Sequence, residues 1–97
     1  MIIGDVRTFP NARTDKEQAL KVLEEASEVF GAWQALDRAQ SFNDIDCSIV
    51  NLVDECADLI TATSNLLAEL DIDDMRPAIK ACEKRNEERG RYARRDG

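Results

Sequence analysis

The chain has 97 residues, which predicts one domain near the lower size limit for a hydrophobic core that is stable alone. Its formal net charge of −7 argues against binding to a nucleic-acid polymer or an anionic membrane, and no apolar run approaches membrane-spanning length. The sequence has no histidine, and its three cysteines form no CxxC pair. These features argue against a zinc site or a disulfide framework and favour a reducing, cytoplasmic location.

The charge is distributed unevenly along the chain. Residues 1–75 hold 5 basic and 16 acidic side chains, whereas residues 76–97 hold 8 basic and 4 acidic ones. An acidic body followed by a basic segment fits a site that gathers cations and then an anionic ligand. A basic helix end that only complements its own dipole fits the same distribution equally well.

The first part of the chain predicts an irregular arm followed by a long helix. Residues 1–13 contain Pro10 and show no clear period, so an irregular N-terminal arm is expected. The sequence TDKE at 14–17 has the form of a capping box, which predicts a helix that begins there and runs to about Ala39. With two prolines, four glycines and little clustering of β-branched residues, the whole chain is expected to be all-α.

A second helix is expected after a short loop. The segment QSFND at 40–44 predicts this loop, and Asn43 or Asp44 is a good N-cap for a helix that ends near Leu70. This gives a helical hairpin.

A third helix is expected after the break DIDDMRP. Asp73 or Asp74 can cap it, and Pro77 is tolerated in its first turn. The helix is expected to fray in the segment GRYARRDG, which leaves residues 93–97 as a C-terminal tail.

Two glutamates of the first helix fall within or beside its apolar stripe. With Glu25 at zero and about 100° per residue, Leu36 lies near 20° and Ala32 near 340°, so apolar groups flank Glu25 on both sides. Glu28 lies at about 300°, on the edge of the stripe, and Glu24 points more outward.

The second helix repeats this arrangement. With Glu55 at zero, Leu66 lies near 20° and Ala62 near 340°, while Asp58 lies at about 300°. The segment EEASE of the first helix thus corresponds to DECAD of the second. If the two helices pack as neighbours, four carboxylates converge where they meet.

Four clustered carboxylates predict a metal site. Their repulsion and lost hydration would cost several kcal/mol if nothing compensated. Protonation is one remedy, but a hard divalent cation compensates more completely, and oxygen ligands suit Mg²⁺ or Mn²⁺. On a single helix, solvated edge residues would explain the pattern better; its recurrence on two helices favours the metal.

Further polar residues share this face. Lys21 lies at about 320° and Gln18 near 20° on the first helix, while Asn51 lies at about 320° and Asn65 at about 280° on the second. Asparagine is unfavourable within helices, so Asn51 and Asn65 are expected to hydrogen-bond to a ligand. Exposed asparagines without a function are the alternative.

The sequence resembles the MazG-like all-α nucleoside triphosphate pyrophosphohydrolases. EEASE, followed after 26 residues by ECAD, is similar to the EExxE and ExxD signature of that superfamily, and KACEKRNEERGRY is similar to its final segment rich in Lys, Asn, Arg and Tyr. The resemblance covers roughly residues 14–92. It implies a Mg²⁺-dependent enzyme that hydrolyses a nucleoside triphosphate between the α and β phosphates, and so removes unwanted nucleotides or controls their pool.

The resemblance also implies roles for individual residues. It gives the metal ligands as Glu25, Glu28, Glu55 and Asp58. A carboxylate is needed to accept the proton of the attacking water, and the candidates are Glu24 and Glu28. Candidate substrate-binding residues are Lys21, Asn51 and Asn65 on the first two helices, and Lys84, Asn86, Arg89, Arg91 and Tyr92 near the C-terminus. The last five fit solvated residues of a terminal helix as well.

The wide apolar stripes predict association of the chain with itself. A three-helix protomer of this size should not stand alone, and the resemblance implies an oligomeric helix bundle, as a homodimer or homotetramer. Phe30, Trp33, Phe42 and Tyr92 are the aromatic residues that could stack on a base, although core packing fits Phe30 and Trp33 better. Two other functions remain open: a phosphoribosyl-ATP pyrophosphohydrolase, and a non-catalytic acidic helical module that binds a basic partner.

Overall fold

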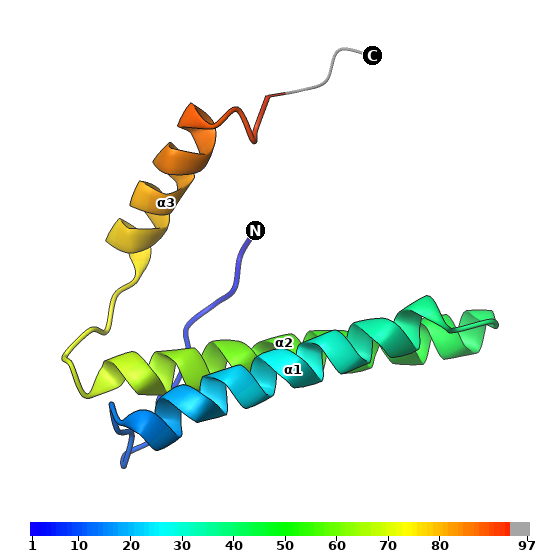
Figure 1. Ribbon diagram of the computed structural model, residues 1–97, viewed down its shortest axis with the longest axis horizontal. Helices are drawn as coiled ribbons and strands as arrows, with labels where there is room; N and C mark the ends of the chain where they lie inside the picture. Colours follow the sequence, from blue (N-terminus) through cyan, green and yellow to red (C-terminus); the bar gives the residue numbers. More distant parts are fainter. Residues whose placement is uncertain (94–97) are drawn as a thin grey trace.

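The structure, a computed structural model, describes residues 1–93 and contains three helices in this part of the chain (Figure 1). They are α1 (Lys16–Asp37), α2 (Phe42–Ala68) and α3 (Arg76–Glu88), and residues 1–93 contain no strand. The predicted all-α fold with a helical hairpin and a third helix is confirmed. Of the predicted tail at 93–97, residues 94–97 lie outside the described residues.

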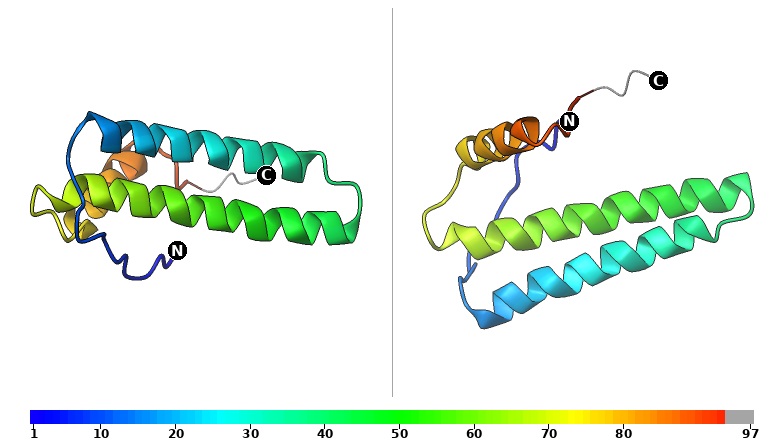
Figure 2. Two further views of the ribbon diagram at one scale, coloured as in Figure 1. Left: turned by 90° about the horizontal axis from the view of Figure 1, so that it is seen from below. Right: turned by 45° about the horizontal axis from the view of Figure 1, so that its top comes forward.

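Helices α1 and α2 form an antiparallel hairpin and lie side by side over most of their length (Figure 2). The most closely packed apolar residues between them are small: Ala32 of α1 and Ala62 of α2 are each 5 % exposed. Because alanine has a short side chain, the two helix backbones can approach closely at these positions. This brings side chains on the neighbouring turns within reach of each other.

Both hairpin helices begin at a side-chain cap, at positions that differ from the predicted ones. Asp15 caps α1, and its carboxylate accepts a hydrogen bond from the backbone N–H of Gln18 at 2.9 Å. Ser41 caps α2, and its hydroxyl accepts from the N–H of Asp44 at 3.1 Å. The expectation that Asn43 or Asp44 caps α2 is therefore wrong, because the Ser41 hydroxyl already serves the first turn.

Helix α3 starts one residue later than its predicted caps. Met75 is the N-cap and has no capping side chain, but the Asp74 carboxylate accepts from the backbone N–H of Arg76 at 3.0 Å and also binds its guanidinium. These contacts with Arg76 lower the pKa of Asp74 to about 2. Pro77 lies in the first turn as predicted, since its missing N–H is not needed there.

Helix α3 packs against neither α1 nor α2 within the described residues. Figures 1 and 2 show it projecting away from the hairpin. Ile79, an apolar residue of α3, is 57 % exposed, and α3 contacts neither helix of the hairpin in the described chain. The hairpin is therefore the only packed unit in the described part of the chain.

The N-terminal arm, residues 1–13, is irregular as predicted and is joined to α2 by a partly buried hydrogen bond. The backbone N–H of Phe9 donates to Oδ1 of Asn65 at 2.8 Å. A turn at Pro10 follows, closed by a hydrogen bond from the N–H of Ala12 to the carbonyl of Phe9 at 3.1 Å. The arm then leads directly into α1.

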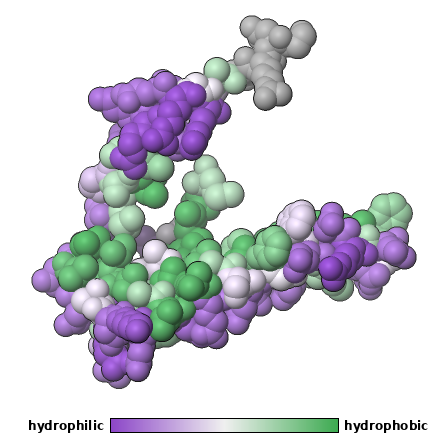
Figure 3. All heavy atoms as spheres, in the orientation of Figure 1, coloured by the Kyte–Doolittle hydropathy of each residue, from purple (hydrophilic) through white to green (hydrophobic). Residues whose placement is uncertain are grey.

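The interior of this hairpin is thin and partly polar. Besides Ala32 and Ala62, the residues buried in the described chain are Glu25 and Asn65, at 7 % and 2 % exposure. Large hydrophobic side chains instead reach the surface over much of the hairpin (Figure 3). None of the described helices is both long and apolar enough to span a membrane.

Candidate metal centre

The hairpin brings three of the four predicted metal ligands together. One carboxylate oxygen from each of Glu25, Glu28 and Glu55 lies within 4.8 Å of the other two. Glu25 is buried, Glu55 is half-buried and Glu28 is exposed. This order follows the helical wheel, which placed Glu25 inside the apolar stripe and Glu28 on its edge.

Two oxygens of this cluster are buried and have no hydrogen-bond partner within the described chain, Oε2 of Glu25 and Oε2 of Glu55. A buried carboxylate oxygen without a partner is unfavourable, because it has lost water and gained nothing in return. The unsatisfied oxygens come from both helices of the cluster. An oxygen-only donor set of this kind fits Mg²⁺ or Mn²⁺, and a bound cation would supply the missing partner for both atoms.

Lys21 forms an ion pair with Oε1, the other carboxylate oxygen of Glu25. Its Nζ lies 3.0 Å from Oε1 of Glu25 and 3.7 Å from Oε1 of Glu24. The hydrogen bond with Lys21 lowers the pKa of Glu25, and the same hydrogen bond raises the pKa of Lys21. Glu25 is therefore held in its charged form, with one oxygen paired and one unpaired.

Glu28 has the opposite electrostatic environment. The neighbouring Glu25 raises the pKa of Glu28, with smaller contributions from partial burial and from Glu55. Since the pKa of Glu25 is lowered and that of Glu28 is raised, Glu28 takes up a proton more readily than Glu25 as pH falls.

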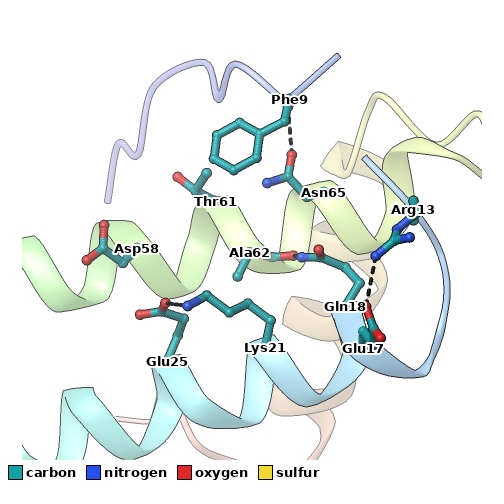
Figure 4. Close-up of a pocket in the computed structure, with 10 residues that line it drawn as sticks. All are labelled: Phe9, Arg13, Glu17, Gln18, Lys21, Glu25, Asp58, Thr61, Ala62 and Asn65. Atoms are coloured by element: carbon teal, nitrogen blue, oxygen red, sulfur yellow. Dashed lines mark hydrogen bonds and ion pairs between the residues drawn. The ribbon is translucent and has the colours of Figure 1, made fainter. Parts of the chain in front are cut away.

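Asp58 lies in the same region but outside the group of three converging oxygens. It lines a pocket of about 480 Å³ that also includes Glu25 and Lys21, between α1, α2 and the arm (Figure 4). Within the described structure, Asp58 thus lines this pocket and is not part of the cluster. Its role as a metal ligand stays a prediction.

The rest of the pocket combines amide, hydroxyl, cationic and aromatic groups. Figure 4 shows them converging from the two helices and the arm. The lining residues besides those already named are Phe9, Arg13, Glu17, Gln18, Thr61, Ala62 and Asn65. Sequence reasoning did not identify Phe9, Arg13 or Thr61, because residues 1–13 carry no periodic signal and a threonine within a helix has many roles.

The polar residues Asn65 and Gln18 already have protein partners. Asn65 holds the arm through its Oδ1, and Nε2 of Gln18 donates to the backbone carbonyl of Ala62 at 2.9 Å. Asn65 was expected to bind a ligand. In the structure its side-chain oxygen instead accepts the hydrogen bond from the arm, so that Asn65 and Phe9 both line the pocket. Asn51 is exposed on α2, one turn before Glu55, and is not among the pocket residues.

The predicted C-terminal substrate residues are not brought to the carboxylates within one chain. They lie on α3 or directly after it, and α3 packs on neither helix of the hairpin. Nη1 of Arg91 donates to Oδ1 of Asn86 at 2.9 Å, so these two residues form a local pair. The other three are exposed: Lys84, Arg89 and Tyr92.

Phe30 and Trp33, two of the aromatic candidates, stack on each other with ring centroids 5.9 Å apart. Both are about half exposed and do not line the pocket.

Comparison with known proteins assigns no family or function, because no family model, curated protein or solved structure matches this chain.

Proposed function

We propose that this protein is a Mg²⁺-dependent nucleotide pyrophosphohydrolase, which hydrolyses a nucleoside triphosphate to the monophosphate and pyrophosphate. The observation that carries the proposal is the pair of buried, unpartnered carboxylate oxygens in the cluster of Glu25, Glu28 and Glu55. The signature-like segments EEASE and ECAD support it, because they place these acids on two neighbouring helices.

Glu25, Glu28 and Glu55 would hold the ion, with Asp58 as the fourth predicted ligand. When bound, Mg²⁺ would offset phosphate charge and favour ionisation of an attacking water. The adjacent pocket suits the remainder of a nucleotide, since it offers an aromatic ring in Phe9 and the guanidinium of Arg13. Arg13 pairs with Asp15 and Glu17, so it would bind a phosphate only by exchanging these partners.

The chain must also accept the proton of the attacking water. In this hydrolysis the water oxygen bonds to phosphorus, the α–β anhydride bond breaks, and pyrophosphate leaves. Two candidates remain: Glu28 has an exposed carboxylate but is also a predicted ligand of the ion, whereas Glu24 is not a member of the carboxylate cluster. Glu24 is exposed too, and it lies 3.7 Å from the Lys21 ammonium.

The basic residues near the C-terminus remain candidates for holding phosphates. Lys84, Arg89 and Arg91 would reach the site of their own chain only after a movement of α3, or the site of a neighbouring chain in an assembly. Arginine can grip phosphate oxygens with two parallel hydrogen bonds.

The direct test measures pyrophosphate release from a panel of canonical and modified nucleoside triphosphates, including phosphoribosyl-ATP, with and without Mg²⁺. At least one substrate should be hydrolysed only with the metal. Glu55→Gln should lower kcat/KM by on the order of 100-fold or more, because even outer-shell changes at metal sites cost 10–100-fold. Asp54→Asn, which removes an exposed acid from the adjacent position, should behave as wild type.

Two outcomes would separate the alternatives. Hydrolysis of phosphoribosyl-ATP alone would narrow the substrate to that compound. No release from any nucleotide, by a protein that still binds Mn²⁺, would contradict the enzymatic function and leave the acidic helical module.

A further inference from the structure

The irregular N-terminal arm is attached to the hairpin in two different ways. Its end is fixed at the start of α1, where Arg13 pairs with Asp15 at 3.1 Å and with Glu17 at 2.9 Å. Earlier in the arm, the backbone N–H of Phe9 donates to Oδ1 of Asn65 on α2 at 2.8 Å, the one hydrogen bond between the arm and α2 in the described chain. The arm is thus fixed at one end and held by a single hydrogen bond along its length.

Asn65 is a rigid anchor for this hydrogen bond. At 2 % exposure it is the most buried of the four buried residues in the described chain. A buried acceptor that loses its partner is unfavourable, because the lost hydrogen bond to water is not replaced. The side chain of Asn65 therefore favours the arm in the position where it supplies the N–H of Phe9.

The rest of the arm is packed loosely on α2. Ile3 and Phe9 are each 62 % exposed. A hollow of about 370 Å³ remains between the arm and α2, lined by Ile3 and Val6 from the arm and by Ala57 and Ile60 from the helix. A segment with so little buried apolar surface opens locally at a small cost in free energy.

The arm separates this hollow from the larger pocket beside the carboxylate cluster. Thr61 lines both of them, and Figure 4 shows the arm passing over α2 with the ring of Phe9 next to Thr61. Phe9 and Arg13 are the residues that the arm contributes to the larger pocket. The third wall of the pocket therefore depends on the position of the arm.

One hydrogen bond is strong enough to decide where the arm lies. The net contribution of a protein hydrogen bond shifts an equilibrium by roughly 2- to 13-fold. Loss of the bond between Phe9 and Asn65 should change the ratio of attached to released arm by a factor of this order. Such a factor converts an arm that is mostly attached into one that is largely released.

We propose that the arm is a strap that opens and closes the pocket, and that Asn65 is the positioning residue that holds it closed. In the open form the hydrogen bond to Asn65 is broken, the arm pivots at the turn that follows Phe9, and the two hollows join into one groove along α2. A ligand that contacts both the arm and the hairpin binds only the closed form and shifts the equilibrium toward it. The strap is a property of the empty protein, so this proposal does not depend on the proposed function.

The test measures amide hydrogen exchange in the full chain, residue by residue, by NMR. After correction for intrinsic rates, the N–H of Phe9 should exchange roughly 10-fold more slowly than those of Arg7 and Thr8, which have no hydrogen-bond partner in the described chain. The amides in the middle of α2 should exchange more slowly still, because they open only with the hairpin.

A matched pair of variants at residue 65 tests the anchor. Asn65→Leu has a similar shape but no acceptor, so the N–H of Phe9 should lose its protection. Asn65→Asp retains an acceptor oxygen in either protonation state and should keep the protection. The amides of α2 show in the same spectra whether the hairpin is intact.

A second pair changes only the arm, so it leaves the hairpin intact. Phe9→Pro removes the N–H that donates to Asn65, whereas Phe9→Ala removes the ring and keeps the N–H. Relaxation of the Thr61 methyl group by a soluble nitroxide measures access to α2 beneath the arm. It should be faster in Phe9→Pro than in Phe9→Ala, while the methyl group of Ala35, which is exposed on α1, should behave alike in both.

Four results would overturn the proposal. In the wild type, the N–H of Phe9 could exchange as fast as that of Thr8, so that the strap is not closed. It could also exchange as slowly as the α2 amides, so that the arm does not open by itself. The others are undiminished protection of Phe9 in a folded Asn65→Leu, and equal relaxation of the Thr61 methyl group in Phe9→Pro and Phe9→Ala. The wild-type and arm measurements decide the matter even if Asn65→Leu fails to fold.

Discussion

The two faces of the hairpin are built from the same two helices but have opposite chemistry. One face carries charged residues around a buried acid, Glu25, which is 7 % exposed. The other carries large apolar residues, such as Leu23 at 66 % exposure. In an ordinary monomer this arrangement would be reversed, with the acid in water and the leucine in the core.

The hairpin alone therefore leaves two unfavourable features, a buried acid and a set of exposed apolar side chains. Burying an acid and exposing apolar residues are both unfavourable, and each is relieved by a different partner. A cation would satisfy the unpartnered oxygens of Glu25 and Glu55, and the second chain that the sequence predicts would cover the exposed apolar residues. The hairpin scaffold would thus be stabilised from both sides by what it binds.

The largest expected effect is on metal binding, and it should leave association of the chain unchanged. Glu25→Gln should weaken Mn²⁺ binding, measured by calorimetry, by on the order of 100-fold or more, because the buried member of the cluster is lost. Its association state in sedimentation should stay that of the wild type, since the substitution leaves the exposed apolar residues of the hairpin unchanged. A change of association state by Glu25→Gln would break the comparison, because it would mean that the two faces are coupled.

A smaller effect is expected from Lys21, which competes with a cation for Glu25. Lys21→Met should tighten Mn²⁺ binding by about two- to fivefold, because exposed ion pairs contribute only modestly and their loss removes one repulsive charge. Lys16→Met, which removes an exposed lysine at the start of α1, is the control. Weaker metal binding in Lys21→Met would show that Lys21 supports the site rather than competing with the ion.

The smallest effect concerns stability and pH at Glu28. Because its pKa is raised in the folded chain, the stability it contributes is complete below its unfolded pKa of 4.5 and is lost as pH rises through the folded pKa. In metal-free buffer Glu28→Gln, which stays neutral, should therefore melt a few degrees above wild type at pH 7. The two melting temperatures should converge near pH 4.

Thermal unfolding followed by circular dichroism checks this, with Asp54→Asn as the control for loss of an exposed charge. Glu25 contributes with the opposite sign, because its pKa is lowered by Lys21 and, to a smaller extent, by Glu28, so the pH dependence of the difference reports on the Glu25–Glu28 pair. Saturating Mg²⁺ should reverse the order of wild type and Glu28→Gln. Equal melting temperatures at pH 7 without metal would argue against strain in the carboxylate cluster.

The hairpin and most of the cluster were predictable from the sequence because both depend on periodicity. A rotation of about 100° per residue is enough to place Glu25, Glu28 and Glu55 at one seam once two helices are expected to be neighbours. The N-cap positions were less predictable, because several polar residues near the start of α2 can cap its N-terminus. The residue that does so is Ser41, before the expected Asn43 and Asp44.

Features without a period could not be predicted. The contact between Phe9 and Asn65 joins residues 56 positions apart, and nothing in the arm indicates it. The position of α3 was not predictable either, because its short apolar surface at Ile79 fits packing on its own hairpin or on another chain. Such long-range choices depend on which surfaces remain exposed after the hairpin has formed, and spacing does not contain that information.

The two buried alanines of the hairpin bear on the choice of ion. Ala32 and Ala62 set how closely α1 and α2 approach, and thereby the gap between carboxylates that stand on different helices. Mg²⁺ requires oxygens at about 2.0–2.1 Å in a rigid octahedron, whereas Ca²⁺ accepts about 2.3–2.6 Å and more ligands. The spacing of α1 and α2 would then determine whether the carboxylates can bind the smaller Mg²⁺ or only the larger Ca²⁺. The alanine methyl groups between the helices would thereby contribute to metal selectivity.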